Sequence, residues 1–231
     1  LGQDVHINGN LDEAVNEGVR RGYEKAYLRR SITADPLQRV NTGDNTPAFL
    51  TVHLVPGDVC KITVAPKGAG SENMSRLTML KPADGVQGVK DFVMETVKQA
   101  GANPCPPIVL GIGIGGTPEK ATLLAKESLM SHIDLQELKE KADSGAELST
   151  VEALRLELFE KVNALGIGAQ GLGGLTTVLD VKILDYPTHA ASKPIAMIPN
   201  CAATRHVEFV LDGSGAANLQ PPSLEDWPDI T

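Results

Sequence analysis

Aromatic residues and cysteines are scarce in this chain of 231 residues. Aromatics make up 3% of the sequence, so the core is expected to rest on Val, Ile, Leu and Ala instead of stacked rings. Only three cysteines occur, an odd number at wide spacing, which excludes the disulfide framework of a small secreted domain. The sequence therefore favours a reducing compartment, and a cytoplasmic location is expected.

Long hydrophobic runs and clusters of positive charge are also missing. No apolar run approaches the roughly 20 residues that span a bilayer, and no secretory signal is recognisable. The net charge is −8 with basic residues spread among acidic ones, which excludes a general nucleic-acid surface. An anionic small-molecule substrate remains compatible, because a local pocket can be basic in an acidic protein. The chain opens at Leu1, and we expect it to start at an internal point of a longer gene product.

Hydrophobic periodicity predicts an α/β fold in which helices surround a mixed sheet. One domain, residues 1–212, is expected to be followed by an extended tail or linker at 213–231. Helices are expected at 11–28, 87–100, 118–131 and, as a pair broken near 144–145, at 134–164. Strands are expected at 49–55 and 59–65, which read as a β-hairpin, and at 108–110, 176–185, 194–198 and 206–211.

Two of the cysteines have contexts that suit a metal-binding thiolate. Cys105 lies among three prolines that fix the local backbone, although a buried structural cysteine is also possible there. Cys201 comes at the expected end of a strand, with Arg205 close behind to favour the thiolate. Cys60 stands in a plain strand and reads as a small apolar residue. Two thiolates make an incomplete site, and no CxxC or HxxxH spacing supplies further zinc ligands.

Three glycine-rich segments stand out, at 67–73, 111–116 and 166–174. In the first, glycines allow backbone N–H groups to approach a ligand, while Lys67 adds charge and Asn73 a donor. A simple turn explains any one of these segments equally well. Three together indicate strand–helix loops that line a site.

The second segment fits the dinucleotide pattern G-x-G-x-x-G. That pattern also needs a strand ending in an acidic residue about 20 residues on, whereas Asp134 opens a charged helical stretch. A nicotinamide-binding domain is therefore only an alternative. An anion cradle at a helix N-terminus and a turn without a ligand are the other interpretations.

His189 and Arg29 are single candidates. His189 lies in a loop after a strand, where it can act as acid, base or hydrogen-bond donor, or simply be solvated. Arg29 and Arg30 end the first helix, where cations also suit the helix dipole.

Taken in order, these segments resemble the class I iron–sulfur fumarases and the related L(+)-tartrate dehydratases. The similarity covers essentially the whole chain. It rests on residues 27–29, 41–47, 65–73, 103–116, 166–174, 187–189, 201–206, 211–215 and 221–227.

The resemblance implies a [4Fe–4S] cluster held by three cysteines, with the fourth iron open to act on the substrate as a Lewis acid. Cys105 and Cys201 would be two of the ligands and His189 a catalytic or substrate-binding residue. The implied substrate-binding residues are Arg29, Lys67, Gly68, Gly70, Ser71 and Asn73. The family's third cluster cysteine lies in a Cys-Gln-Asp-Thr-Gly motif, which this chain lacks, so the chain alone is expected to be inactive.

The implied activity is reversible hydration of fumarate to (S)-malate, with a place in the tricarboxylic acid cycle. Dehydration of L(+)-tartrate to oxaloacetate is the near alternative, and an inactive binding fragment is a further one. The resemblance also implies a β subunit or C-terminal domain as partner, and a homodimer or α2β2 assembly. Arg29 and His189 are expected to meet at one pocket, because the substrate is a dianion that needs a binding group at each end. Family sites can borrow groups across a subunit interface, so the two residues can meet within a chain or between chains.

Overall fold

The computed structural model describes residues 1–132, 134–203 and 205–213. The chain forms two compact units, one of residues 63–207 and one of residues 1–62 together with the described residues from Glu208 onward. Most of the tail predicted at 213–231 lies outside the described residues.

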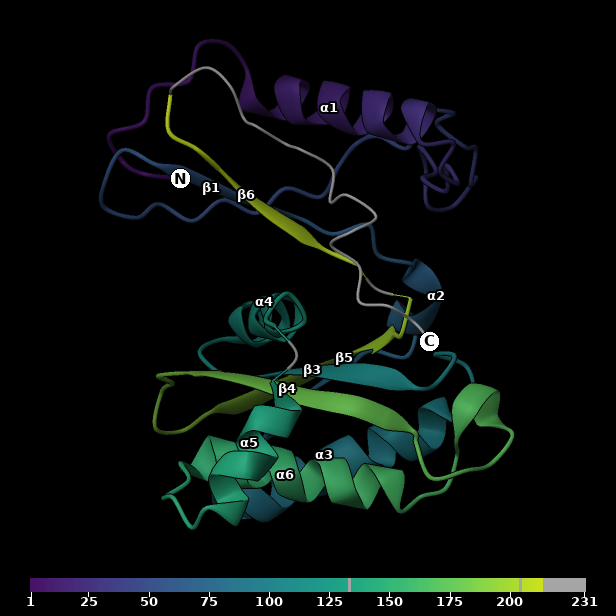
Figure 1. The fold of residues 1–231 in the computed structure, drawn as a ribbon, viewed down its shortest axis with the longest axis vertical. Coiled ribbons are helices and arrows are strands. Elements are labelled where there is room, and N and C mark those ends of the chain that lie inside the picture. The colour runs from purple at the N-terminus through teal and green to yellow at the C-terminus, as the bar shows by residue number, and fades with distance from the viewer. Residues whose placement is uncertain (133, 204, 214–231) are drawn as a thin grey trace. The chain divides into compact units, whose positions relative to one another are not determined.

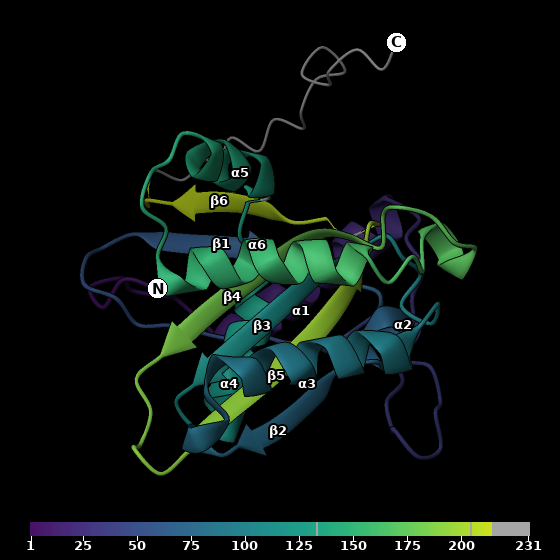
Figure 2. The same ribbon diagram turned by 90° about the horizontal axis from the view of Figure 1, so that it is seen from below.

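The 63–207 unit is built on a four-stranded sheet in the order β2–β5–β3–β4 (Figure 2). Strands β2 and β3 both run antiparallel to β5, whereas β3 and β4 run parallel. This confirms the predicted mixed sheet. The strands are β2 (Arg76–Leu80), β3 (Ile108–Gly115), β4 (Val178–Tyr186) and β5 (Lys193–Cys201).

Helices cover both faces of this sheet (Figure 1). Helices α3 (Gly85–Ala100) and α6 (Thr150–Asn163) pack on one face and α4 (Pro118–Ser128) on the other. The helical pair expected at 134–164 is confirmed as α5 (Leu135–Asp143) and α6, and Ser149 begins α6 with a capping box to Glu152. Short helical turns complete the unit: α2 (Ala69–Glu72) and the 3₁₀ helices η1 (Pro82–Asp84) and η2 (Ala169–Gly171).

The segment 111–116 is mostly strand, not the predicted glycine loop. Strand β3 continues to Gly115 because its glycines let α4 approach the sheet closely. A Cβ atom on Gly111 would lie 2.2 Å from the carbonyl oxygen of Ala125, and one on Gly113 would lie 1.9 Å from that of Ala121. Two glycines on the strand thus face two alanines on the helix, which is a packing role.

The other unit contains helix α1 (Leu11–Lys25) and a two-stranded sheet of β1 (Cys60–Val64) and β6 (Val207–Leu211). The helix expected at 11–28 is confirmed. The predicted β-hairpin of 49–55 and 59–65 is wrong, because β1 pairs with β6 and residues 49–55 form no strand. Val55 instead makes an isolated bridge to Gly2. In the part of the chain that the structure describes, no helix is long and apolar enough to cross a membrane.

Candidate functional site

Cys105 and Cys201 come together at one end of the central sheet. In the antiparallel register of β3 and β5, Cys201 is opposite Ile108, the first residue of β3. The N–H of Ala202 donates to the carbonyl oxygen of Pro107 at 3.1 Å, so the loop that carries Cys105 lies beside the end of β5. Both thiols are free, with Cys105 exposed and Cys201 half-buried.

The loop around Cys105 is held in an uncommon backbone conformation. Cys105 has a φ of 56°, in the left-handed region that a residue with a side chain adopts only when its surroundings hold it there. The support comes from the third glycine-rich segment, where the backbone N–H of Gln170 donates to Pro106 at 2.7 Å. Gly171 of the same segment packs against Ala102, since a Cβ there would lie 2.3 Å from the Ala102 Cβ. The segment 166–174 therefore packs against the loop that carries Cys105 and helps to hold its backbone in place.

Lys67 is the buried cation of this end of the sheet. Its side chain is 7% exposed, and its Nζ lies 3.5 Å from a carboxylate oxygen of Glu72, which also pairs with Lys126. Burial lowers the pKa of Lys67 below its ordinary value, and the Glu72 carboxylate opposes part of that shift. Helix α2, which begins two residues after Lys67, lies against β5, the strand that ends at Cys201. A cation in such a dry position gains more from a nearby anion than an exposed one does.

The rest of the loop around Lys67 leaves room for a ligand. Neither Gly68 nor Gly70 has the positive φ that favours glycine. A Cβ atom added at either position would meet nothing within 4 Å. Neither the backbone angles nor packing against the described residues therefore requires glycine at the two positions. Ser71 is buried, with its hydroxyl donating to Gly68 at 3.4 Å, and Asn73 is exposed. All five candidates belong to the segment 67–73, and its helix α2 lies against the strand that ends at Cys201.

Asn200 is a residue that the sequence did not single out. Its side chain is 1% exposed, and neither amide atom has a hydrogen-bond partner among the described residues. A buried amide without partners is costly, and Asn200 directly precedes Cys201. No pattern in the sequence distinguishes this asparagine from a turn residue, because its burial depends on the pairing of β5 with β3.

His189 lies at the opposite end of the same sheet. Gly115 of β3 pairs with Tyr186, and the β4–β5 connection that carries His189 follows. Seven strand steps separate Ile108 from Gly115, which is roughly 23 Å at about 3.3 Å per residue. Within the 63–207 unit, the structure therefore does not bring His189 to the two cysteines.

His189 lines a pocket of about 410 Å³ at the start of helix α4. Its Nδ1 accepts a hydrogen bond from the N–H of Ala191 at 3.1 Å, so Nε2 carries the proton of the neutral ring. The hydroxyl of Thr188 donates to the carbonyl oxygen of Gly116 at 2.9 Å and ties this loop to the end of β3. Lys120 also lines the pocket, and its Nζ lies 5.0 Å from the centre of the Tyr186 ring.

Arg29 and Cys60 belong to the unit that contains α1. Arg29 is exposed and makes no hydrogen bond or ion pair with any described residue, whereas Arg30 donates to the carbonyl oxygen of Gly43 at 2.7 Å. Of the two arginines, only Arg29 keeps its guanidinium free for a ligand. Cys60 opens strand β1 and is half-buried, as expected of a small strand residue.

Asp134 is not available to a nucleotide ribose. Its carboxylate accepts from Arg155 at 2.5 Å and from Lys182 at 2.6 Å. These two cations hold the pKa of Asp134 well below its usual range, Arg155 contributing most through its hydrogen bond. Together with the strand at 111–115, this leaves no support in the structure for the nicotinamide alternative.

Comparison with known sequences gives the same result as the motifs. The model of the family described as fumarate hydratase (Fumerase) matches residues 1–210. The chain belongs to this fumarate hydratase family. It is 45% identical over 199 residues to a protein of Methanocaldococcus jannaschii that bears the name of an L(+)-tartrate dehydratase subunit alpha. That match covers 84% of this chain and 66% of the relative.

Two further family members come from Escherichia coli. The chain is 32% identical over 217 residues to the anaerobic class I fumarate hydratase of strain K12, covering 93% of this chain and 39% of the relative. It is 34% identical over 209 residues to the L(+)-tartrate dehydratase subunit alpha of strain UTI89, covering 89% and 66%. The chain thus spans about two thirds of the matched tartrate dehydratase subunits and well under half of the matched fumarate hydratase.

Proposed function

We propose that this chain is the cluster-binding part of an iron–sulfur hydro-lyase that acts on a four-carbon dicarboxylate. The observation that carries the proposal is that Cys105 and Cys201 lie at the same end of β3 and β5, where helix α2, two residues after the buried Lys67, lies against β5. Reversible hydration of fumarate to (S)-malate is the first candidate reaction. Dehydration of L(+)-tartrate to oxaloacetate is the second, and the 45% identity to a relative with that name favours it.

The residues at this end of the sheet fit a cluster with an incomplete protein ligand set. Cys105 and Cys201 would supply two thiolates, and the third is expected from a cysteine outside this chain. The buried, unpartnered amide of Asn200 next to Cys201 fits a polar group in this region. When bound, a [4Fe–4S] cluster with one open iron supplies a Lewis acid for the substrate hydroxyl. With two of three thiolates, the chain by itself is expected to be inactive.

The chain's own residues would bind and orient the dianion. Burying two carboxylates requires paired cations or several donors. Arg29 offers a planar fork that has no partner among the described residues, and Lys67 offers a buried ammonium. The open backbone at Gly68 and Gly70 lets a substrate carboxylate approach N–H groups closely, with Ser71 and Asn73 adjacent in the same segment.

His189 is proposed to serve the cysteine pair of a second copy of the chain. Within the 63–207 unit it stands about 23 Å from the cysteine end of the sheet by strand geometry, too far for proton transfer to a substrate bound there. In a symmetric dimer, each copy can complete the site of the other. Because Nδ1 accepts from Ala191, the neutral ring carries its proton on Nε2 and can donate it in a hydrogen bond to the substrate.

Mixed dimers test this arrangement. The enzyme is assembled from chains carrying Cys105→Ala and chains carrying His189→Asn, each inactive in a pure dimer. If the site is shared between copies, the mixture regains activity, because some dimers contain one site with both native residues. A mixture that stays inactive although the two chains are shown to associate would place both residues in one copy.

A β subunit or C-terminal domain is the proposed partner, in line with the relatives named as alpha subunits. The unit that contains α1 offers the surface, since many of its large apolar side chains are exposed. They include Leu37, Val40, Phe49, Leu54, Val59 and Val210.

The free thiols of all three cysteines fit a reducing compartment such as the cytoplasm.

Cysteine variants of the complete enzyme test the cluster assignment. Cys105→Ala and Cys201→Ala are each expected to lose the cluster, whereas Cys60→Ala, the matched control, is expected to keep it. Iron content and the visible absorption band after anaerobic reconstitution measure retention independently of activity. The native enzyme is then assayed with fumarate, (S)-malate and L(+)-tartrate under anaerobic conditions. Iron loss in Cys60→Ala equal to that in the other two variants would show that the ligand assignment is wrong.

A further inference from the structure

Arg29 has a free side chain on a backbone that is fixed on both sides. Before it, helix α1 ends in a Schellman motif, in which Leu28 N–H donates to Tyr23 at 3.0 Å and Tyr27 N–H to Glu24 at 3.3 Å. Tyr27 takes the left-handed position of this motif with a φ of 51°, a place usually held by glycine. Its side chain is 96% exposed. The helix end therefore fixes where the chain enters Arg29.

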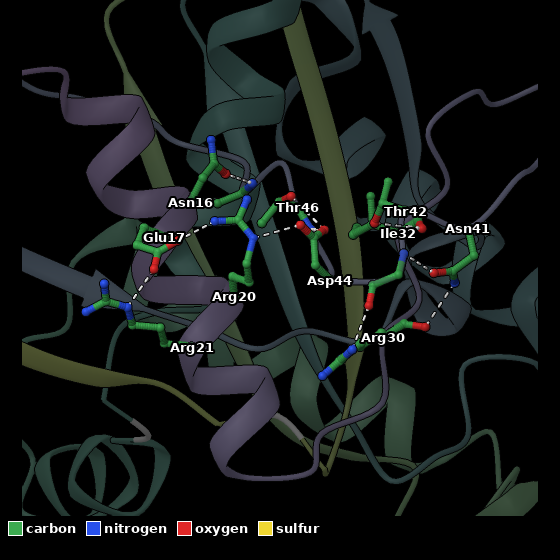
Figure 3. A network of polar contacts seen from close by, with 12 residues as sticks. Asn16, Glu17, Arg20, Arg21, Arg30, Ile32, Asn41, Thr42, Asp44 and Thr46 are labelled. Atoms are coloured by element: carbon green, nitrogen blue, oxygen red, sulfur yellow. Dashed lines mark hydrogen bonds and ion pairs between the residues drawn. The ribbon is translucent and has the colours of Figure 1, made fainter.

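After Arg29, the chain is bound to the loop 41–45. The side-chain oxygen of Asn45 accepts from the N–H groups of Ser31 at 2.7 Å and Ile32 at 3.2 Å. Two bonds flank this pair: Arg30 donates to the Gly43 carbonyl, and Asn41 donates to the Arg30 carbonyl at 3.1 Å (Figure 3). One side-chain oxygen thus accepts hydrogen bonds from two consecutive backbone amides, two and three residues after Arg29.

The loop itself is anchored to helix α1. Asp44 accepts from Arg20 Nε at 2.9 Å, and the N–H of Ala48 donates to the side-chain oxygen of Asn16 at 2.7 Å (Figure 3). Hydrogen bonds from Thr46 and then from Arg20 hold the pKa of Asp44 well below its ordinary value, so the carboxylate stays charged. Arg20 also pairs with Glu17 one turn earlier. The contacts run from the helix through Asp44 to Asn45 and on to the segment that carries Arg29.

We propose that Asn45 is a positioning residue for Arg29, and that the ion pair between Arg20 and Asp44 anchors Asn45 to helix α1. The inference rests on the proposed role of Arg29 in binding a substrate carboxylate. Holding a cation in its binding geometry before the ligand arrives reduces the entropy lost on binding. Loss of Asn45 should therefore weaken substrate binding more than it slows the chemical step.

Asn45→Gly in the complete enzyme removes the accepting oxygen and tolerates the φ of 64° at this position. KM for the dicarboxylate is expected to rise on the order of tenfold, with kcat and iron content nearly unchanged. Asn45→Asp keeps an oxygen at the same place and should recover most of the loss. Amide hydrogen exchange at Ser31 and Ile32 should be about tenfold faster in Asn45→Gly than in the native enzyme.

Arg20 and Arg21 provide a matched pair of controls. Arg20→Gln breaks the bond to Asp44 and should raise KM, whereas Arg21→Gln breaks only an exposed pair with Glu17 and should not. An unchanged KM in Asn45→Gly, while Arg29→Lys raises KM, would overturn the proposal. So would a joint loss of kcat and iron, which indicates a general structural role. If the native enzyme converts neither dicarboxylate, the proposed function fails, and the exchange measurement still decides whether Asn45 holds the segment.

Discussion

The two units of this chain are stabilised in different ways. In the 63–207 unit, helices on the two faces of a sheet enclose two clusters of buried, mostly aliphatic side chains, one on each face. Among the described residues of the other unit, no hydrophobic side chain is buried, and even helix α1 buries none. That unit is held by polar bonds between side chains and loop backbone, such as those of Asn45 and Asp44.

This difference in burial predicts which of the two units gains more from being covered by a partner. Burial of aliphatic surface supplies most of the stability of a domain, and polar bonds in water contribute about 1 kcal/mol each. The 63–207 unit can therefore fold on its own core. The unit that carries Arg29 is expected to gain stability when its exposed apolar side chains are covered in the assembled enzyme.

A core truncation should separate the two units most clearly. Leu158 in α6 is 0% exposed, and Leu158→Ala should lower the free energy of unfolding by about 2–5 kcal/mol. Phe49 in the other unit is 91% exposed, and Phe49→Ala in the isolated chain should change it by less than about 0.5 kcal/mol. Chemical denaturation followed by circular dichroism measures both.

The same Phe49→Ala variant sharpens the comparison in the assembled enzyme. There it should weaken association, measured by the protein concentration at which the complex dissociates. Equal losses of stability from Leu158→Ala and Phe49→Ala in the isolated chain would mean that the two units share one core.

Glycine substitutions should give a smaller effect of the same kind. Gly113→Ala forces a Cβ against the backbone of α4 and should cost about 1–3 kcal/mol of stability. Gly70→Ala meets no neighbouring atom and should leave stability unchanged or raise it by up to about 1 kcal/mol. Thermal unfolding of the two variants side by side gives the difference.

A measurement of substrate affinity in Gly70→Ala then tests whether this glycine serves ligand binding. A fall in substrate affinity without a fall in stability would assign the glycine to ligand approach. A stability loss as large as that of Gly113→Ala would instead show that the loop packs against the chain more tightly than its geometry indicates.

The fold of the 63–207 unit could be predicted where its pattern is local. Helices with a continuous apolar face and strands of β-branched residues were found close to their true bounds, as in α6 and β4. Residues 111–115 were misread, because a glycine that allows helix packing and a glycine that allows a turn look alike in sequence. The partner of β1 was also wrong, since β6 lies more than a hundred residues away and alternation alone favours the nearest strand.

The sequence predicted which residues belong to the candidate site better than it predicted where they lie in the fold. The contexts of Cys105 and Cys201 identified them, and the pairing of β3 with β5 supplied the reason that they meet. The separation of His189 from them depends on strand direction, which no local pattern encodes. Asn45 was missed as a site residue because an asparagine in a turn ordinarily bonds only its own loop.

The hydrogen bond from the N–H of Ala202 to the carbonyl oxygen of Pro107 has a consequence for motion. Among the described residues it links the backbones of the two cysteine loops, and it lies just past the last paired residues of β3 and β5. Strand ends open far more often than strand centres, so this amide is expected to exchange with solvent on a faster timescale than those of the core. Its exchange rate would thus report how often the loops separate, and any ligand that bridges both thiolates should slow it. One amide can in this way serve as a native reporter of the cysteine pair, with no added probe.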